Sequence, residues 1–99
     1  MLLIVGTVRL PAANLAAARP VMQQMVDASR GEPGCIEYSY AEDLFDPGLI
    51  HVKELWRSQE ALDCHFASDH LARWRASWAA LGIGERSLRV YQVGEGAPV

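Results

Sequence analysis

The segment Leu2–Leu10 is apolar on both of the faces that an extended strand presents. Successive side chains of a strand point to opposite sides. The two resulting faces hold Leu2, Ile4 and Val8, and Leu3 and Val5. An antiparallel sheet with one face in water alternates apolar and polar residues instead. We therefore expect a strand, ended by Pro11, whose second face is covered by something besides the domain's own helices.

Three helical patterns follow. The first starts after Asn14, a residue type that favours helix N-caps, and Pro20 inside it predicts a kink or an irregular start. We expect Ser58 and Asp69 to cap the second and third helices. The apolar stripes are Leu15, Ala18, Met22, Met25, Val26 and Ser29 in the first helix, Ala61, Leu62, His65 and Phe66 in the second, and Leu71, Trp74, Trp78 and Leu81 in the third.

Three further strands are expected between and after these helices. Residues 31–34 contain two glycines and a proline, which break the first helix and lead into a strand over Cys35–Glu42. The turn Asp46-Pro47-Gly48 connects that strand to Leu49–Trp56. A last strand over Ser87–Val93 precedes a tail at 94–99.

The order strand, helix, strand, strand, helices, strand indicates an α+β fold of the ferredoxin-like split βαβ type, with an antiparallel sheet and helices on one face. We expect a single domain over 1–99, with its core at about 2–93. The face without helices must be solvated, filled by a ligand or covered by a second subunit. The apolar first strand favours a covered face.

Charge and composition exclude several classes of function. The net charge is −3 and the chain has a single lysine, Lys53, so it lacks the clustered basic residues that nucleic-acid binding requires. The apolar run 1–5 is too short for a signal peptide or a membrane span, which indicates a cytoplasmic protein. Cys35 and Cys64 are expected to be buried small hydrophobic residues without a disulfide bond.

Two short motifs resemble one known family. They are Glu32-Pro33-Gly34-Cys35-Ile36-Glu37-Tyr38, and Glu54-Leu55-Trp56 followed by Ser58, Ala61-Leu62, His65 and Ser68-Asp69-His70. Both resemble the antibiotic biosynthesis monooxygenase family, and with the element order the similarity covers residues 2–93. The resemblance implies a homodimer that forms a dimeric α/β barrel, and oxygenation of quinol-like or phenolic polyketide substrates without metal or flavin in some members. Other members cleave haem or isomerise phosphorylated signals, so the fold does not settle the chemistry.

Glu54 and His65 are the candidate catalytic residues. Glu54 shares a strand face with Ile50, Val52 and Trp56, and burial among them would raise the pKa of its carboxyl towards that of a base. His65 lies on the buried side of its helix, where an imidazole suits proton transfer at neutral pH. Two alternatives stay open: Glu54 pairs with an arginine or lysine, or His65 bonds a backbone carbonyl.

The candidate substrate-binding residues are His70, Trp56, Trp74, Tyr38, Phe66 and Thr7. Trp74 and Trp78, together with Tyr38 and Tyr40, could line a pocket for a flat aromatic substrate. The alternative is that the tryptophans belong to the core and the tyrosines pack on the second subunit. For His70 the alternative is a purely structural role at the start of its helix.

The sequence predicts no metal or cofactor. His65 and His70 are five residues apart across a helix break and no C-x-x-C pair occurs, so the spacing is not that of a zinc site. The haem-degrading relatives use an asparagine, a tryptophan and a histidine where this chain has Thr7 or its neighbour, His65 and Arg75. The preferred prediction is therefore a cofactor-independent monooxygenase that takes dioxygen and a small aromatic substrate. An isomerase of a small phosphorylated or carbonyl metabolite, or a non-catalytic dimeric binding or stress module, is the alternative.

Overall fold

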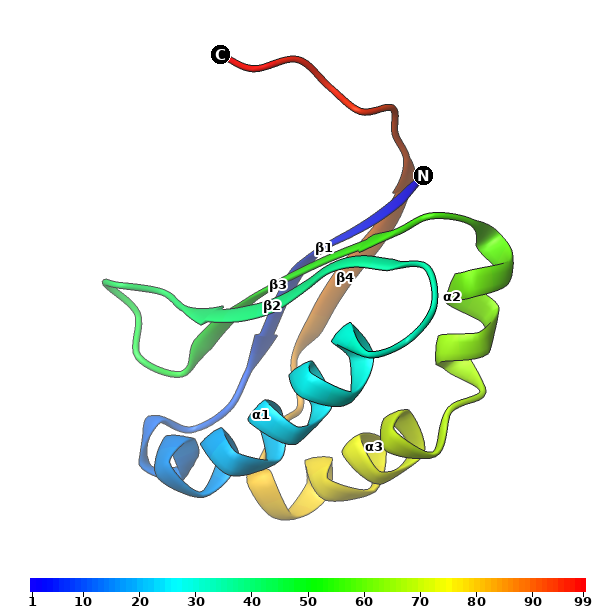
Figure 1. Cartoon of the computed structure of the whole chain (residues 1–99). Helices are drawn as coiled ribbons and strands as arrows, with labels where there is room; N and C mark the ends of the chain where they lie inside the picture. Colours follow the sequence, from blue (N-terminus) through cyan, green and yellow to red (C-terminus); the bar gives the residue numbers. More distant parts are fainter.

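The chain runs through a strand, a helix, two strands, two helices and a final strand (Figure 1). The computed structural model describes all residues, 1–99. The elements in order are β1 (Leu2–Arg9), a short 3₁₀ turn (Ala12–Asn14), α1 (Leu15–Arg30), β2 (Cys35–Glu42), β3 (Leu49–Trp56), α2 (Gln59–Phe66), α3 (Asp69–Leu81) and β4 (Arg86–Gln92). None of the helices has the length and apolar character that crossing a bilayer requires.

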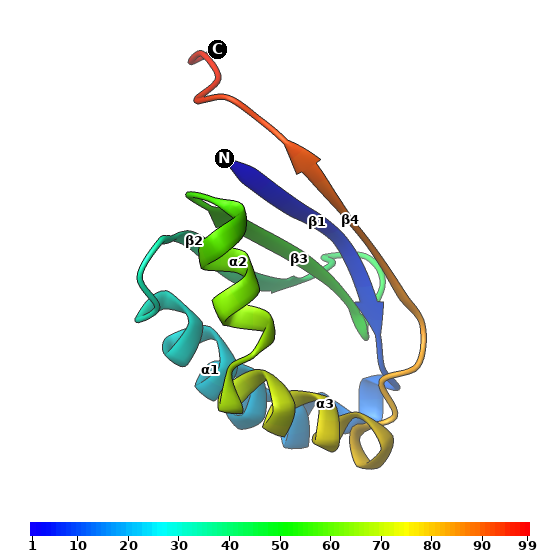
Figure 2. The same ribbon diagram turned by 90° about the vertical axis from the view of Figure 1, so that its right-hand side faces the viewer.

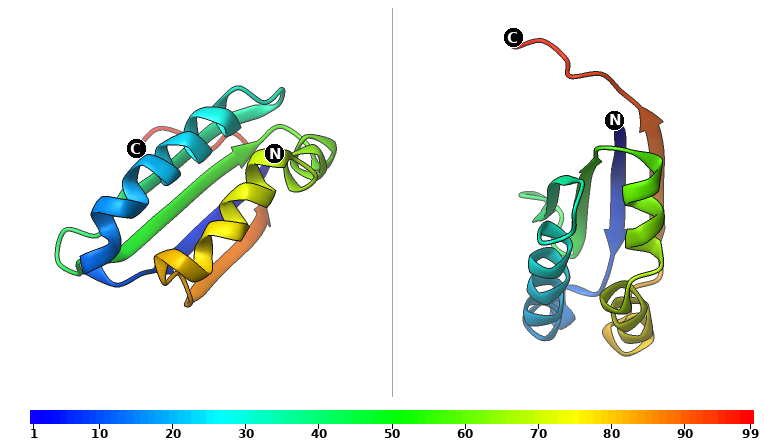
Figure 3. Two further views of the ribbon diagram at one scale, coloured as in Figure 1. Left: turned by 90° about the horizontal axis from the view of Figure 1, so that it is seen from below. Right: turned by 45° about the vertical axis from the view of Figure 1, so that its right-hand side comes forward.

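The strands form one sheet in the order β2-β3-β1-β4, and every neighbouring pair is antiparallel. All three α-helices cover the same face of this sheet, as Figure 2 shows from the side. Helices α1 and α3 run side by side across that face (Figure 3). The predicted ferredoxin-like α+β fold is therefore confirmed.

Alternation along the strands decides which residues reach the core. In β3, Ile50, Val52 and Trp56 are buried under the helices, whereas His51 and Lys53 are exposed on the other face. The buried set contains few polar groups, because burying one without a partner is costly. Those buried polar residues are Ser29, Glu54 and His65.

Two helix starts differ from the sequence prediction. The side chain of Asn14 makes no cap for α1 and instead donates a hydrogen bond to the Leu81 carbonyl, 2.9 Å away, after a 3₁₀ turn that supplies the irregular start. Helix α1 then continues through Pro20 without a break. Ser68, rather than Asp69, caps α3, because its hydroxyl accepts from the Leu71 amide.

The start of β2 and the cysteines also depart from the prediction. A bulge between Cys35 and Glu37 shifts the register, so Cys35 pairs with Trp56 and packs against the core, while Ile36 is exposed. Cys64 lies on the outer side of α2 and is exposed, so the expectation that both cysteines are buried is wrong.

Candidate active site

A cavity of about 240 Å³ lies between the helix-covered face of the sheet and the helices α2 and α3. Its walls are mainly apolar and aromatic, which is typical of sites for small organic ligands. Its few polar groups come from different elements of the fold. They are Tyr38, Tyr40, Glu54, His65, Arg75, Arg86 and Arg89.

His65 stands at one end of this cavity with a carboxylate behind it. The ring is 1% exposed, and its Nδ1 lies 2.7 Å from Oε1 of Glu32. An ionised carboxylate can only accept hydrogen bonds, so Nδ1 carries the proton and Nε2 is left as an acceptor. Burial lowers the pKa of His65, and the hydrogen bond and negative charge of Glu32 oppose that shift.

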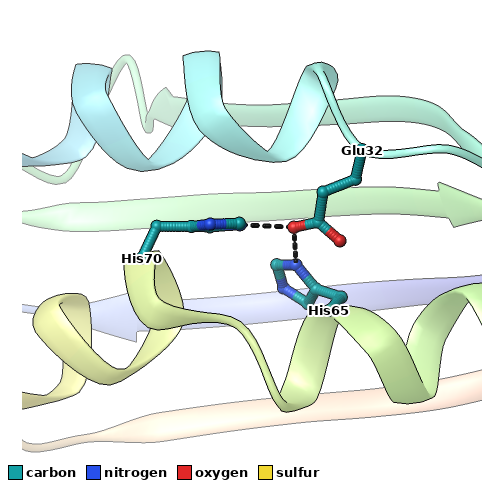
Figure 4. A group of neighbouring side chains, drawn as sticks. All are labelled: Glu32, His65 and His70. Atoms are coloured by element: carbon teal, nitrogen blue, oxygen red, sulfur yellow. Dashed lines mark hydrogen bonds and ion pairs between the residues drawn. The ribbon is translucent and has the colours of Figure 1, made fainter.

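The same carboxylate oxygen also bonds Nε2 of His70, at the N-terminus of α3 (Figure 4). Glu32 comes from the turn after α1, His65 from α2 and His70 from α3, so the cluster ties three helices together. His70 is partly exposed and does not line the cavity. It therefore connects the buried pair to the surface.

Gly34 allows the turn that carries Glu32 to approach α2. Its φ of 83° lies in the left-handed region, and a Cβ atom there would stand 2.6 Å from Cβ of Ala61. Only glycine adopts this conformation at little cost and leaves room for the helix. The Glu-Pro-Gly sequence of residues 32–34 thus forms a turn that places Glu32 within hydrogen-bond distance of His65.

Glu54 points into the cavity from β3. It is 6% exposed, and its Oε1 accepts a hydrogen bond of 3.0 Å from Nε1 of Trp56. Burial raises the pKa of the Glu54 carboxyl to about 7, and the Trp56 hydrogen bond opposes that shift. Oε1 lies 3.9 Å from Nε2 of His65, too far for a hydrogen bond. Within the chain, no arginine or lysine forms a salt bridge with Glu54, so the predicted alternative of such a pair across the sheet is wrong.

Aromatic rings form the remaining walls. The hydroxyls of Tyr38 and Tyr40 are 2.8 Å apart, and the Tyr40 ring stacks on Trp74 at a centroid distance of 5.8 Å. Trp78 meets Trp74 edge-on at 6.2 Å. Both tyrosines thus face the helices, so the alternative that they pack on a second subunit is wrong.

Glu32, His65 and His70 are also the residues that could hold a metal ion. Their donor atoms lie within 4.8 Å of one another, although the sequence spacing gave no sign of it. A zinc ion needs each donor at about 2.0–2.2 Å. Here both rings donate to a single carboxylate oxygen, so a cation would have to displace two hydrogen-bond protons. The three side chains are already joined to one another by hydrogen bonds.

Residues 1–77 match the family described as antibiotic biosynthesis monooxygenase. A Mycobacterium tuberculosis protein provisionally named a monooxygenase is 33% identical over 84 residues, which cover 85% of this chain and 77% of that protein. The chain belongs to the antibiotic biosynthesis monooxygenase family. Its fold follows that of other members: a Deinococcus radiodurans protein assigned to the family superposes with a TM-score of 0.92 at 26% identity, over 100% of this chain and 98% of that one.

Two further comparisons extend this assignment. The structure of the Mycobacterium tuberculosis relative has a TM-score of 0.84 at 26% identity and covers 98% of both chains. An uncharacterised Synechocystis protein is 32% identical over 73 residues, which make up 74% of this chain. This chain spans about half, 50%, of the Synechocystis relative's length.

The structure brings together most of the site residues that the sequence predicted for this family member. His65, Glu54, Tyr38, Trp74 and Phe66 line the cavity. Trp56 and His70 do not line the cavity. They contact the site through hydrogen bonds, since Trp56 donates to Glu54 and His70 donates to Glu32.

Thr7 does not belong to the site. It pairs with His51 and Ser87 on the face of the sheet that has no helices, because β1 alternates and its even-numbered residues face the core. The sequence prediction missed Glu32, Arg75 and Arg86. Of these, Glu32 alone carried a signal, as the first residue of the Glu-Pro-Gly turn.

Proposed function

We propose that this protein is a homodimeric, cofactor-independent monooxygenase that acts on a small quinol-like or phenolic substrate. One observation carries the proposal. In a mainly apolar cavity, the imidazole of His65, hydrogen-bonded to the Glu32 carboxylate, lies close to the buried carboxyl group of Glu54. Such a cavity can hold an aromatic ring and dioxygen, while the acid–base pair removes a proton from the ring's hydroxyl.

His65 is the proposed base. Its Nε2 is the unprotonated nitrogen and lies at the cavity, while Nδ1–H is held by Glu32. When Nε2 takes the phenolic proton, the Glu32 carboxylate stabilises the imidazolium that forms. Acid–base assistance of this kind contributes about 10²–10⁴-fold to a rate.

Glu54 and Tyr38 have supporting roles in this proposal. Oε1 of Glu54 lies 3.9 Å from Nε2 of His65, so the negative form of Glu54 also favours the imidazolium. Burial raises the pKa of the Tyr38 phenol, which keeps its hydroxyl protonated as a hydrogen-bond donor. A donor beside the cavity can steady negative charge on the substrate oxygen.

The substrate itself supplies the electrons in this reaction. One atom of dioxygen enters the ring of a hydroquinone, and the other leaves as water with two hydrogens of the substrate. The product is a hydroxyquinone, and the four electrons that dioxygen accepts come from the ring. The protein's part is to bind the ring, exclude water and move the protons.

Oxygen uptake with a panel of hydroquinones and anthrones tests the proposal. We expect uptake by the native protein, its loss in His65→Ala, and its retention in His51→Ala, because His51 is exposed and bonds only Asp43. Turnover that persists under nitrogen would instead favour an isomerase on the same scaffold. Absence of both turnover and binding would favour a non-catalytic module.

The proposed homodimer rests on the sheet face that carries no helix. Leu3 of β1 lies between Leu55 of β3 and Tyr91 of β4 in the strand register, so three apolar side chains form a row across that face. Val5 adds a fourth on the next position of the same face. A second copy of the chain would cover this row and would form the dimeric barrel that the sequence resemblance implies.

A further inference from the structure

Three arginines, Arg75, Arg86 and Arg89, line the same cavity as His65 and Glu54. Arg89 lies opposite Val5 in the sheet, so its side chain starts on the helix-free face, and Arg75 and Arg86 are the two arginines whose side chains start on the side of the cavity. Arg75 reaches it from α3 and Arg86 from β4, so the positive charge comes from two separate elements. Neither forms a salt bridge with a carboxylate. Glu54 is the only carboxyl group that lines the cavity. The site therefore offers uncompensated positive charge in a protein whose net charge is −3.

Arg86 is held in place by an aromatic ring. Its guanidinium carbon lies 4.1 Å from the centre of the Trp78 ring, which is within the range of a cation–π contact. Stacking uses the flat face of the guanidinium and leaves its N–H edge free. That edge fits the two oxygens of a carboxylate or phosphate in a bidentate manner.

The size of the cavity limits the rest of the ligand. A cavity of about 150 Å³ is enough to enclose benzene. The cavity here measures about 240 Å³, which leaves room for one aromatic ring and its substituents. Trp74, stacked on Tyr40, gives a flat wall for such a ring.

We propose that the ligand is a single-ring aromatic compound with an anionic oxygen group, a carboxylate or a phosphate, which Arg75 and Arg86 bind. The ring then lies against Trp74, and its hydroxyl group faces His65 and Glu54. Only this last contact rests on the proposed monooxygenase function. Anion binding by the two arginines requires no turnover.

Calorimetric titration of the full chain under nitrogen tests the binding step alone. The probes are gentisate, its neutral methyl ester, and hydroquinone monophosphate. We expect at least one of the two anions to bind about tenfold more tightly than the ester, because hydrogen bonds between a guanidinium group and an anion are stronger than those to a neutral ester. The anion that binds more tightly identifies the group as carboxylate or phosphate.

The variant Arg75→Gln/Arg86→Gln should bind the anions and the ester with similar affinity. The variant Arg57→Gln/Arg73→Gln is the charge-matched control, since both of its arginines are exposed and neither lines the cavity. It should keep the preference for the anion, and thermal melts would show that both variants fold. Equal binding of anions and ester by the native protein, or a preference that survives in Arg75→Gln/Arg86→Gln, would overturn the inference.

The two proposals can fail separately. A preference for anions without any oxygen uptake would refute the monooxygenase and leave this inference standing. Oxygen uptake without a preference for anions would refute this inference alone.

Discussion

Glu32 stands at the centre of the candidate site although it does not touch the cavity. One of its oxygens accepts hydrogen bonds from both His65 and His70, and its charge acts directly on the imidazole that faces the cavity. A carboxylate in this place fixes the ring orientation and the tautomer. The catalytic competence of His65 should therefore depend on the charge at residue 32, and not only on its shape.

Glu32→Gln tests that dependence. Glutamine keeps the size of the side chain but cannot balance an imidazolium, so we expect turnover to fall by about 100-fold. The loss of a negative neighbour also lowers the pKa of His65 further, so the acid side of the pH–rate profile should move to lower pH. Proton NMR of the His65 ring checks the same shift without turnover. Glu37→Gln, at an exposed position, should change neither, and an unmoved His65 titration in Glu32→Gln would rule out the assigned role.

Glu54 makes folding stability depend on pH. Burial raises the pKa of its carboxyl from 4.5 to about 7 in the folded state, so the folded chain binds more protons than the unfolded chain between these values. The free energy of unfolding contributed by this residue therefore falls as the pH rises through that window. Each pKa unit corresponds to about 1.4 kcal/mol.

Glu54→Gln should remove this dependence, because the amide oxygen still accepts from Trp56 but carries no charge. We expect equal stability of the variant and the native protein near pH 4.5, and a variant more stable by up to about 3 kcal/mol near pH 8. Urea denaturation at both pH values, at one protein concentration, measures the difference. A stability difference that does not change with pH would contradict the assignment.

At the scale of elements, periodicity predicted the strands, the helices and the face that each one buries. It also placed His65, Trp74 and Glu54 on core-facing positions, because burial follows directly from the period of the element. It could not find Glu32, Arg75 or Arg86 as members of the site. Glu32 sits in a turn, where no period applies, and the arginines are exposed residues whose meeting depends on how α3 crosses β4. The left-handed conformation of Gly34 determines how closely the turn that carries Glu32 approaches α2.

Gly34→Ala should disturb both the fold and the site. A side chain in the left-handed region costs about 1–3 kcal/mol, and its Cβ would push the turn away from Ala61 on α2. Because that turn carries Glu32, we expect lower thermal stability together with a shifted His65 titration. Gly31→Ala is the matched control: Gly31 has an α-helical φ of −80°, and the nearest atom to an added Cβ is 3.5 Å away. Equal effects of the two substitutions would show that the Gly34 conformation is not what positions Glu32.

At the scale of the whole molecule, one face of the sheet is packed under three helices and the other is bare. The bare face holds the apolar row of Leu3, Leu55 and Tyr91. A chain of 99 residues buries a smaller share of its surface than a larger domain does. Burial of the bare face by the proposed second copy would therefore supply stability that one chain lacks.

Leu3→Glu places a charge in the middle of the apolar row and should abolish this pairing. On a single chain the substitution is mild, because the side chain lies on the face without helices and can reach water. Within a dimer it would bury a carboxylate with no partner, at a cost of several kcal/mol. We expect analytical ultracentrifugation to give a dimer for the native chain at micromolar concentration and a monomer for Leu3→Glu. Ala17→Glu, the same change in charge at an exposed position of α1, should remain dimeric. A native chain that sediments as a monomer would refute the pairing, whereas a Leu3→Glu chain that still dimerises would place the interface on another surface.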